Sequence, residues 1–334
     1  MMDSPRANNV TNYLIAYVHP QLKPFLYISA CVTFAVVVES ALCSMAIMTS
    51  KVLNRSGTAK LVATLTITYF VKGAGMFLID LIDVHSPKSR HLFLARHVTC
   101  FFTWAIFIFG ETLVVDISFI IAIEVCTSSM SPMSVRHRKK RYWTVGKWCF
   151  VVLHSVITTV RIWVPTSQNQ SMQCRFFQIV NSGLVLWVLI EYNAFSVSTL
   201  FIYALGLIRT RKSVREASSR HTDAITRKRT LKWKMTVALA ISYLIFALNL
   251  LLQTIVMTIV ASTHDVRLFA AMMKTRSLSG ISSLLSVSIL FIQTKQARRA
   301  VLRLIAKWRN RTRSTVSTIE TRMPYGKRSS TQSF

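Results

Sequence analysis

The sequence predicts an all-α membrane protein: a bundle of seven transmembrane helices followed by an amphipathic juxtamembrane eighth helix. The chain of 334 residues is 52% hydrophobic and only 16% charged, which is too apolar for a soluble domain of this size. Its apolar residues are concentrated in seven stretches, and its basic residues lie mainly between them. The formal net charge of +29 is therefore assigned to membrane topology and not to nucleic-acid binding.

Each apolar stretch meets the rough requirement of ~17–25 residues for a helix that crosses a bilayer. The first follows a polar segment and is too long for the core of a signal peptide, which predicts a retained span. The seventh is short and serine-rich, and its small residues suit a contact between helices. The stretches are 25–48, 61–82, 98–125, 144–164, 176–208, 235–261 and 277–293.

Basic residues and short motifs predict the sidedness of the chain. With the N-terminus outside, 30 of the 41 Lys and Arg residues lie in cytoplasmic segments and 10 in extracellular ones. This bias predicts a multi-pass protein of the plasma membrane with a cytoplasmic C-terminus. Asn9 and Asn169 begin glycosylation sequons on the predicted outer side. Cys100 and Cys174 both face this oxidising side, which predicts a disulfide bond between them.

The predicted order of segments is simple. Residues 1–24 form an extracellular N-terminus and residues 25–294 the seven-transmembrane domain. Residues 295–309 alternate apolar and basic side chains at helical spacing, which predicts an amphipathic helix on the anionic inner leaflet. A calmodulin-like partner is the less favoured reading of this helix. Residues 310–334 are rich in Ser, Thr and Arg and predict a disordered cytoplasmic tail open to phosphorylation.

Half of the twelve acidic residues fall inside the predicted spans. A carboxylate that faces lipid costs at least ~2.5 kcal/mol even on a mild insertion scale, so these groups should point into the bundle or toward its interfaces. They are the candidate functional residues of the chain. The six are Glu39, Asp80, Glu111, Asp116, Glu124 and Glu191.

The sequence leaves two interpretations of Glu111 open. It lies about three turns below Cys100 and could be a counter-ion or hydrogen-bond acceptor in a ligand cavity. Alternatively it pairs with Lys72, a basic residue deep in the second span, since an unpaired buried lysine is costly. Glu39 is the rival partner for Lys72.

Other polar residues of the spans suggest contacts between helices. Asp116 is on a different helical face from Glu111 and is expected to bond to another helix, as is His154. Asn249 and Gln253 have the same interpretation. Residues 191–193 (Glu-Tyr-Asn) either line a cavity opposite Glu111 or form a local hydrogen-bonded cluster.

Nothing in the sequence suggests an enzyme. No nucleophile, base and orienting group can be placed together on the predicted spans. No cluster of His, Cys, Asp and Glu has the spacing of a metal site, and the sequence predicts neither a metal nor a cofactor.

Four features together resemble the rhodopsin-like G-protein-coupled receptors, over roughly residues 25–310. They are the seven spans with an outer N-terminus, the pair Cys100 and Cys174, Trp148 early in the fourth span, and the amphipathic helix after the seventh. Degenerate versions of the pattern look like invertebrate chemosensory serpentine receptors or orphan receptors encoded by herpesviruses. Of the two, we favour the chemosensory type.

The chain departs from that family at its switch positions. Glu124, Val125 and Cys126 stand where the family usually has Asp-Arg-Tyr, so the arginine is replaced by Val125. Lys72 lies in the middle of the second span, near the position at which members of that family have an Asp that binds sodium. The sixth span has no proline, and residues 287–291 read Val-Ser-Ile-Leu-Phe instead of Asn-Pro-x-x-Tyr.

The resemblance implies a receptor of unknown ligand that transduces an extracellular or intramembrane signal to a cytoplasmic heterotrimeric G protein. We expect ligand contacts at Glu111, Phe107, Glu191 and Tyr192, and G-protein coupling at Glu124, Val125 and Cys126. Arrestin or kinases are expected at the C-terminal tail. The alternatives are a signalling-impaired scaffold that pairs with other receptors, and an ion- or proton-coupled transporter. The second is disfavoured because the halves show no internal repeat.

Overall fold

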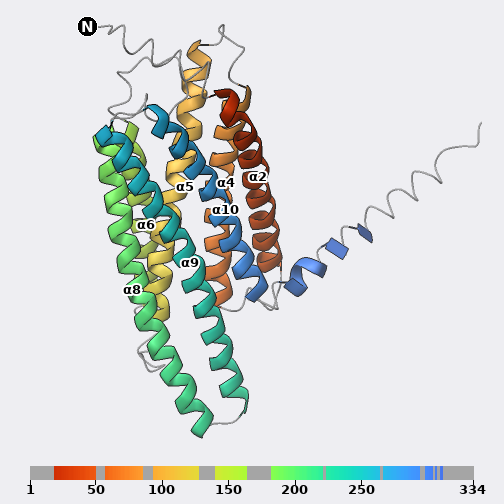
Figure 1. Cartoon of the computed structure of the whole chain (residues 1–334). Helices are drawn as coiled ribbons and strands as arrows, with labels where there is room; N and C mark the ends of the chain where they lie inside the picture. Colours follow the sequence, from red (N-terminus) through yellow and green to blue (C-terminus); the bar gives the residue numbers. More distant parts are fainter. Residues whose placement is uncertain are drawn as a thin grey trace, which may run out of the picture.

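The computed structural model describes seven long helices and parts of a short C-terminal helix within residues 298–310. Each of the seven overlaps one of the predicted spans along most of its length, which confirms the all-α, seven-helix membrane fold (Figure 1). They are α2 (His19–Thr49), α4 (Gly57–His85), α5 (Phe93–Thr127), α6 (Lys140–Trp163), α8 (Ser182–Arg220), α9 (Asp223–Thr263) and α10 (Val266–Gln293).

Six of these helices close into a ring. Neighbours pack in the order α2, α4, α5, α8, α9, α10 and back to α2. Helix α6 lies outside this ring, packed on α5 and only marginally in contact with α8. The core between the helices is built from apolar side chains of all seven, among them Ile121, Leu239 and Leu290, which are fully buried.

Five of the described helices contain a segment long and apolar enough to cross a membrane. The segment of α10, Ser277–Ile292, is apolar but shorter, as the serine-rich sequence suggested. The five are Pro24–Thr49, Lys60–Ile82, Phe102–Thr127, Leu186–Arg215 and Lys232–Val256.

Helices α8 and α9 run well past the ends of their apolar stretches, and the two form a hairpin that projects below the bundle (Figure 1). Residues 209–220 and 223–234, which follow and precede the predicted spans, are therefore helical and not a loop. Hydropathy marks where a helix leaves the bilayer, not where it ends. No Gly or Pro occurs between Gly206 and Met235, so no helix-breaking residue interrupts α8 before it ends at Arg220 or α9 after it begins at Asp223.

The expected amphipathic helix is described in part. Residues 298–303 are helical, with Val301 buried and Ala300 packed against the core, whereas Arg298 and Arg303 are exposed. This segment extends away from the end of α10 (Figure 1).

Hydroxyl groups join neighbouring helices of the ring. Asp80 of α4 accepts hydrogen bonds from Ser29 and Thr33 of α2, at 2.8 and 3.2 Å. Ser242 of α9 and Ser286 of α10 each donate to the other's backbone carbonyl, at 3.2 and 3.0 Å. Such bonds satisfy polar groups that lipid cannot.

Two glycines let α4 and α5 approach to backbone contact. A Cβ at Gly75 of α4 would lie 2.6 Å from the backbone nitrogen of Phe107 in α5. A Cβ at Gly110 of α5 would lie 2.6 Å from the backbone of Lys72 in α4. Because real Cβ atoms do not approach backbone this closely, only glycine allows this crossing at either position.

Replacing these glycines should separate the two helices. We expect Gly75→Ala and Gly110→Ala each to lower the free energy of unfolding by about 1–3 kcal/mol, the usual range for overpacking. Thermal unfolding of the purified protein measures the loss. The matched control is Gly146→Ala on α6, where an added Cβ meets nothing within 4 Å. Midpoints for all three variants equal to that of the wild type would contradict the close crossing.

Candidate functional site

A fully buried ion pair lies at the crossing of α4 and α5. Lys72 Nζ is 2.8 Å from Glu111 Oε2, and the two side chains are 0% and 6% exposed. Of the two readings of Glu111, the structure shows the pairing with Lys72. Among the described residues neither charged group has a further well-directed hydrogen bond, so Coulomb attraction is what holds the pair together.

A third helix completes the surroundings of this pair. The Lys72 ammonium lies 4.7 Å from the centre of the Phe246 ring on α9, within range of a cation–π contact. Asn249, one turn further along α9, is buried, and its amide has no hydrogen-bond partner within the described part of the chain. The expected interhelical bond of Asn249 is therefore not seen.

Glu39, the rival partner for Lys72, is engaged elsewhere. Its Oε1 accepts a hydrogen bond of 2.8 Å from Ser288 of α10. This contact closes the ring between α2 and α10. The partner of Lys72 is thus decided by the α4–α5 crossing, which places Glu111 against it.

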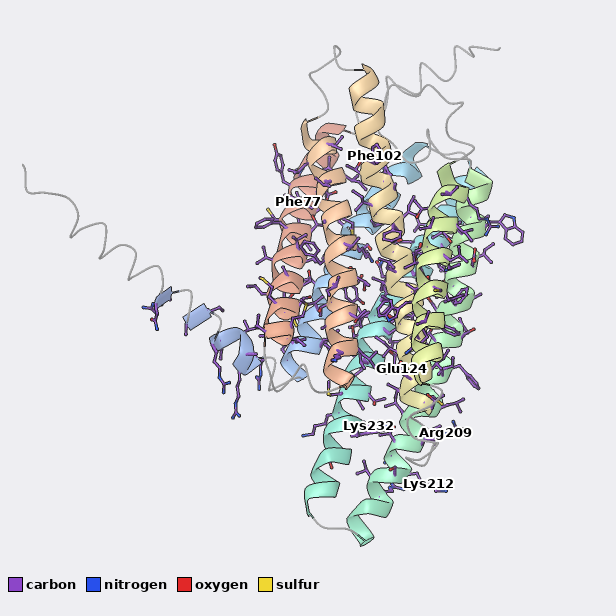
Figure 2. The ribbon with its side chains drawn as sticks, turned by 180° about the vertical axis from the view of Figure 1, so that it is seen from behind. Phe77, Phe102, Glu124, Arg209, Lys212 and Lys232 are labelled. Carbon is purple, nitrogen blue, oxygen red and sulfur yellow. The ribbon has the colours of Figure 1, made fainter. Side chains whose placement is uncertain are left out.

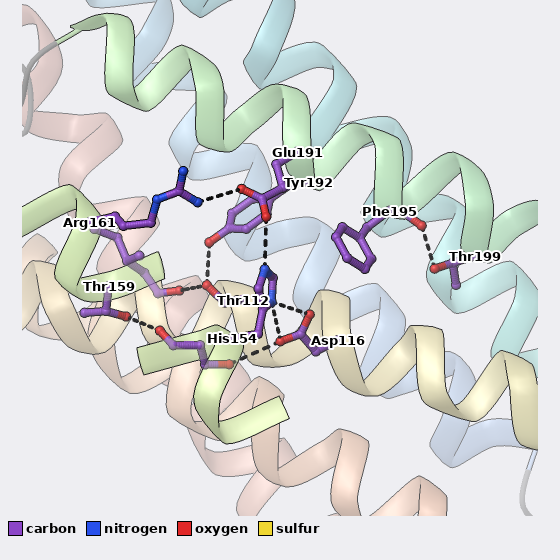
Figure 3. A network of polar contacts seen from close by, with 11 residues as sticks. Thr112, Asp116, His154, Thr159, Arg161, Glu191, Tyr192, Phe195 and Thr199 are labelled. Atoms are coloured by element: carbon purple, nitrogen blue, oxygen red, sulfur yellow. Dashed lines mark hydrogen bonds and ion pairs between the residues drawn. The ribbon is translucent and has the colours of Figure 1, made fainter. Parts of the chain in front are cut away.

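A second polar cluster joins α5, α6 and α8 (Figure 3). His154 of α6 has Nδ1 at 2.9 Å from both carboxylate oxygens of Asp116 on α5. Its Nε2 lies 3.1 Å from Glu191 Oε1 on α8. Ser155 donates to Asp116 at 3.3 Å, and Arg161 lies 3.7 Å from Glu191. The predicted roles of Asp116 and His154 as links between helices are confirmed.

The three consecutive residues 191–193 contact three different helices. Glu191 faces α6, whereas the Tyr192 hydroxyl hydrogen-bonds to Thr112 of α5 (Figure 3). Asn193 donates to Thr254 of α9 at 2.6 Å. They do not form the local cluster that was one of the two expectations, because successive residues of a helix point about 100° apart.

The residues expected to couple to a G protein lie at the C-terminal end of α5, next to where α8 leaves the bundle (Figure 2). Glu124 forms an ion pair with Lys147 of α6, and Cys126 accepts a hydrogen bond of 3.1 Å from Arg209 of α8. Val125 is buried, and its side chain faces Gly206 of α8, where an added Cβ would lie 3.3 Å away.

The remaining predicted positions are placed as follows. Phe107 is half-buried and packs edge-on against Trp104, with ring centres 5.7 Å apart. The Cys174, Asn9 and Asn169 positions and the side chain of Cys100 lie outside the described residues, so the disulfide and the glycosylation sites stay predictions. Gly75 and Gly110, which allow the close crossing, were not among the predicted positions; a glycine near the middle of each of two neighbouring spans is the signal that could have found them.

Removing one member of the central pair should be more harmful than removing both. We expect Lys72→Met or Glu111→Leu alone to lower the free energy of unfolding by about 3–5 kcal/mol, because each leaves a buried charge without its partner. The double variant should recover most of that loss. Thermal unfolding measures all three. Losses that simply add in the double variant would mean that the two charges do not interact.

The comparison with known proteins concerns the fold. No family model and no curated protein matches the sequence. Among solved structures, the chain is similar to squid rhodopsin, with a TM-score of 0.64 at 12% sequence identity, over 86% of this chain and 86% of that chain. The helices described above, and the two polar clusters between them, are therefore built on the seven-helix fold seen in rhodopsin.

Proposed function

We propose that the protein is a receptor of the G-protein-coupled type, in which a ligand from the outside or from the bilayer changes the packing of the helices and thereby the cytoplasmic surface. The fold, which is similar to that of squid rhodopsin over 86% of this chain, supports this interpretation. The proposed partners are an unidentified ligand, a heterotrimeric G protein and anionic lipids of the inner leaflet.

The observation that carries the proposal is the helical hairpin formed by α8 and α9. Residues 209–220 follow the predicted apolar stretch 176–208 and add about 18 Å of helix to α8, at 1.5 Å per residue. Arg209, Lys212 and Lys232 lie on this projection, near the end of α5 (Figure 2). Topology alone explains positive charge at the membrane surface, but it does not require that the basic segment be helical and project from the bundle. An acidic surface of a cytoplasmic protein fits that projection.

The proposed switch differs from that of the resembling family at the end of α5. The described charge contacts there join α5 to α6 and α8, through Glu124 with Lys147 and Cys126 with Arg209. Between α8 and α9 the described bonds include uncharged ones, such as the 3.0 Å bond from Tyr243 to Ser196 of α8. An outward movement of α9 would break hydroxyl bonds but would leave the ion pair of Glu124 with Lys147 intact. Because such a movement breaks only weak bonds there, we expect measurable basal activity.

The ligand would act on the central pair. Lys72 and Glu111 lie where α4, α5 and α9 meet, so a ligand that competes for either charge would alter three helices at once. Glu111, Phe107, Glu191 and Tyr192 remain the proposed ligand-contact residues.

A panel of G-protein activation sensors in cells tests the proposal. We expect basal or ligand-evoked signalling from the wild type, altered by Glu111→Gln at equal surface level. Ser198→Ala is the control, since that exposed hydroxyl bonds only to its own helix at the Ala194 carbonyl in the described contacts. If a well-expressed wild type is silent and only Val125→Arg signals, the chain is a receptor-like scaffold that has lost coupling. Silence from every variant contradicts the proposal.

The proposed sidedness has a separate test. A glycosidase-sensitive increase in mass should disappear in the double variant Asn9→Gln/Asn169→Gln. Free-thiol labelling after denaturation should rise when the chain is first reduced, and Cys100→Ser or Cys174→Ser should remove that difference. Cys149→Ser is the matched control, because Cys149 is a free thiol on the exposed face of α6. Asn54 and Asn310 also begin glycosylation sequons, but they lie on the predicted cytoplasmic side. Glycosylation at either would contradict the proposed orientation.

A further inference from the structure

His154 lies between two carboxyl groups that come from different helices. Both oxygens of Asp116 are 2.9 Å from its Nδ1, and one oxygen of Glu191 is 3.1 Å from its Nε2 (Figure 3). Both ring nitrogens are therefore at hydrogen-bond distance from an acidic oxygen.

This geometry requires one proton more than a neutral ring provides. A neutral imidazole has one N–H donor and one lone pair. In either tautomer, the lone pair of the other nitrogen would face a carboxylate oxygen about 3 Å away, which is repulsive. Only the imidazolium form donates a hydrogen bond to both carboxylates.

We propose that Asp116, His154 and Glu191 form a proton-binding site whose bound proton, carried by the imidazole, fastens α6 to α5 and α8. Helix α6 stands outside the ring and barely packs on α8, so it depends on polar contacts more than its neighbours do. Within the described residues, its polar contacts with α8 run from His154 and Arg161 to Glu191. Loss of the proton therefore loosens α6.

The neighbouring groups favour a charged ring. The Phe150 ring stacks parallel to His154 with centres 5.6 Å apart, and Phe195 of α8 lies 5.5 Å away on a tilt. Aromatic faces attract a cation. On α8 the next ionisable group, Tyr192, is bonded to Thr112 and does not contact the ring.

The other charges of the surrounding helices have partners of their own. On α5, Glu111 is paired with Lys72 and Glu124 with Lys147. Arg161, on the same helix as His154, lies 3.7 Å from the second oxygen of Glu191, so the cation nearest to the site contacts Glu191 and not the imidazole.

Protons can reach the site from the outer end of α6. Arg161 belongs to the last turn of α6, and its side chain is 60% exposed, while Glu191 is 30% and His154 15% exposed. Exposure thus decreases along the chain of contacts from Arg161 to Glu191 to His154. With the proposed orientation, the site responds to the pH outside the cell.

The pH dependence of thermal stability tests this site without any assumption about signalling. Because the folded state holds the proton more tightly than the unfolded chain, stability is present at low pH and is lost as pH rises through the titration of the site. We expect the unfolding midpoint of the full chain in lipid nanodiscs to fall as the pH rises above about 6.5, the ordinary pKa of a histidine side chain.

The decisive variant is Glu191→Gln. Its amide can donate to Nε2 of a neutral ring while Nδ1–H still donates to Asp116, so the extra proton is no longer needed. The variant should remain folded and lose the pH dependence. Glu39→Gln is the matched control, as this carboxyl group bonds to Ser288 in a different part of the bundle and should leave the dependence intact. A pH-independent wild type, or a Glu191→Gln variant that keeps the full dependence, would overturn the proposal.

Nitrogen NMR of the wild type with labelled histidine provides a readout that needs no variant to fold. One of the eight histidines should show both ring nitrogens protonated at about pH 7.5 and should lose a proton over the range in which stability falls. Eight neutral rings at that pH would also overturn the proposal.

Discussion

A lysine and a glutamate removed from both water and lipid have to remain together, and this requirement determines how the centre of the bundle is built. Separating Lys72 from Glu111 would leave two uncompensated charges in a medium that solvates neither. The contact is possible because Gly75 and Gly110 let α4 and α5 meet backbone to backbone. Phe246 extends the contact to α9. One ion pair and two glycines therefore fix the position of three of the seven described helices.

Around this centre the helices are joined by hydroxyl groups and shared carboxylates. The sixth described helix, α9, contains no proline and has no hinge of the kind that the resembling family uses, yet it bonds to α8 through Tyr243 and to α10 through Ser242. These bonds are individually weak, and in a membrane they average well under 2 kcal/mol. A bundle held in this way can change the packing of one helix without breaking its central ion pair. The peripheral α6 depends instead on His154 and its two carboxyl partners.

The sequence was sufficient for the number and order of helices, because a bilayer imposes a minimum length on apolar runs. It was not sufficient for helix ends, since α8 and α9 continue past their predicted apolar stretches, where hydropathy gives no signal. It left two partners for Lys72, because helical phase is known within one span but not between spans. The register of α4 against α5, set at the two glycines, decides for Glu111. Which helix each of residues 191–193 contacts also depends on how the spans are rotated relative to one another, and the sequence does not show this.

The measurement that tests the central pair most directly is a charge exchange. Lys72→Glu and Glu111→Lys each place two like charges face to face in the core, so both single variants should give little folded protein at the cell surface. The double variant restores opposite charges at the same two positions, and we predict that its folded surface level approaches that of the wild type. Single variants as abundant as the wild type, or a double variant no better than the poorer single one, would contradict the account.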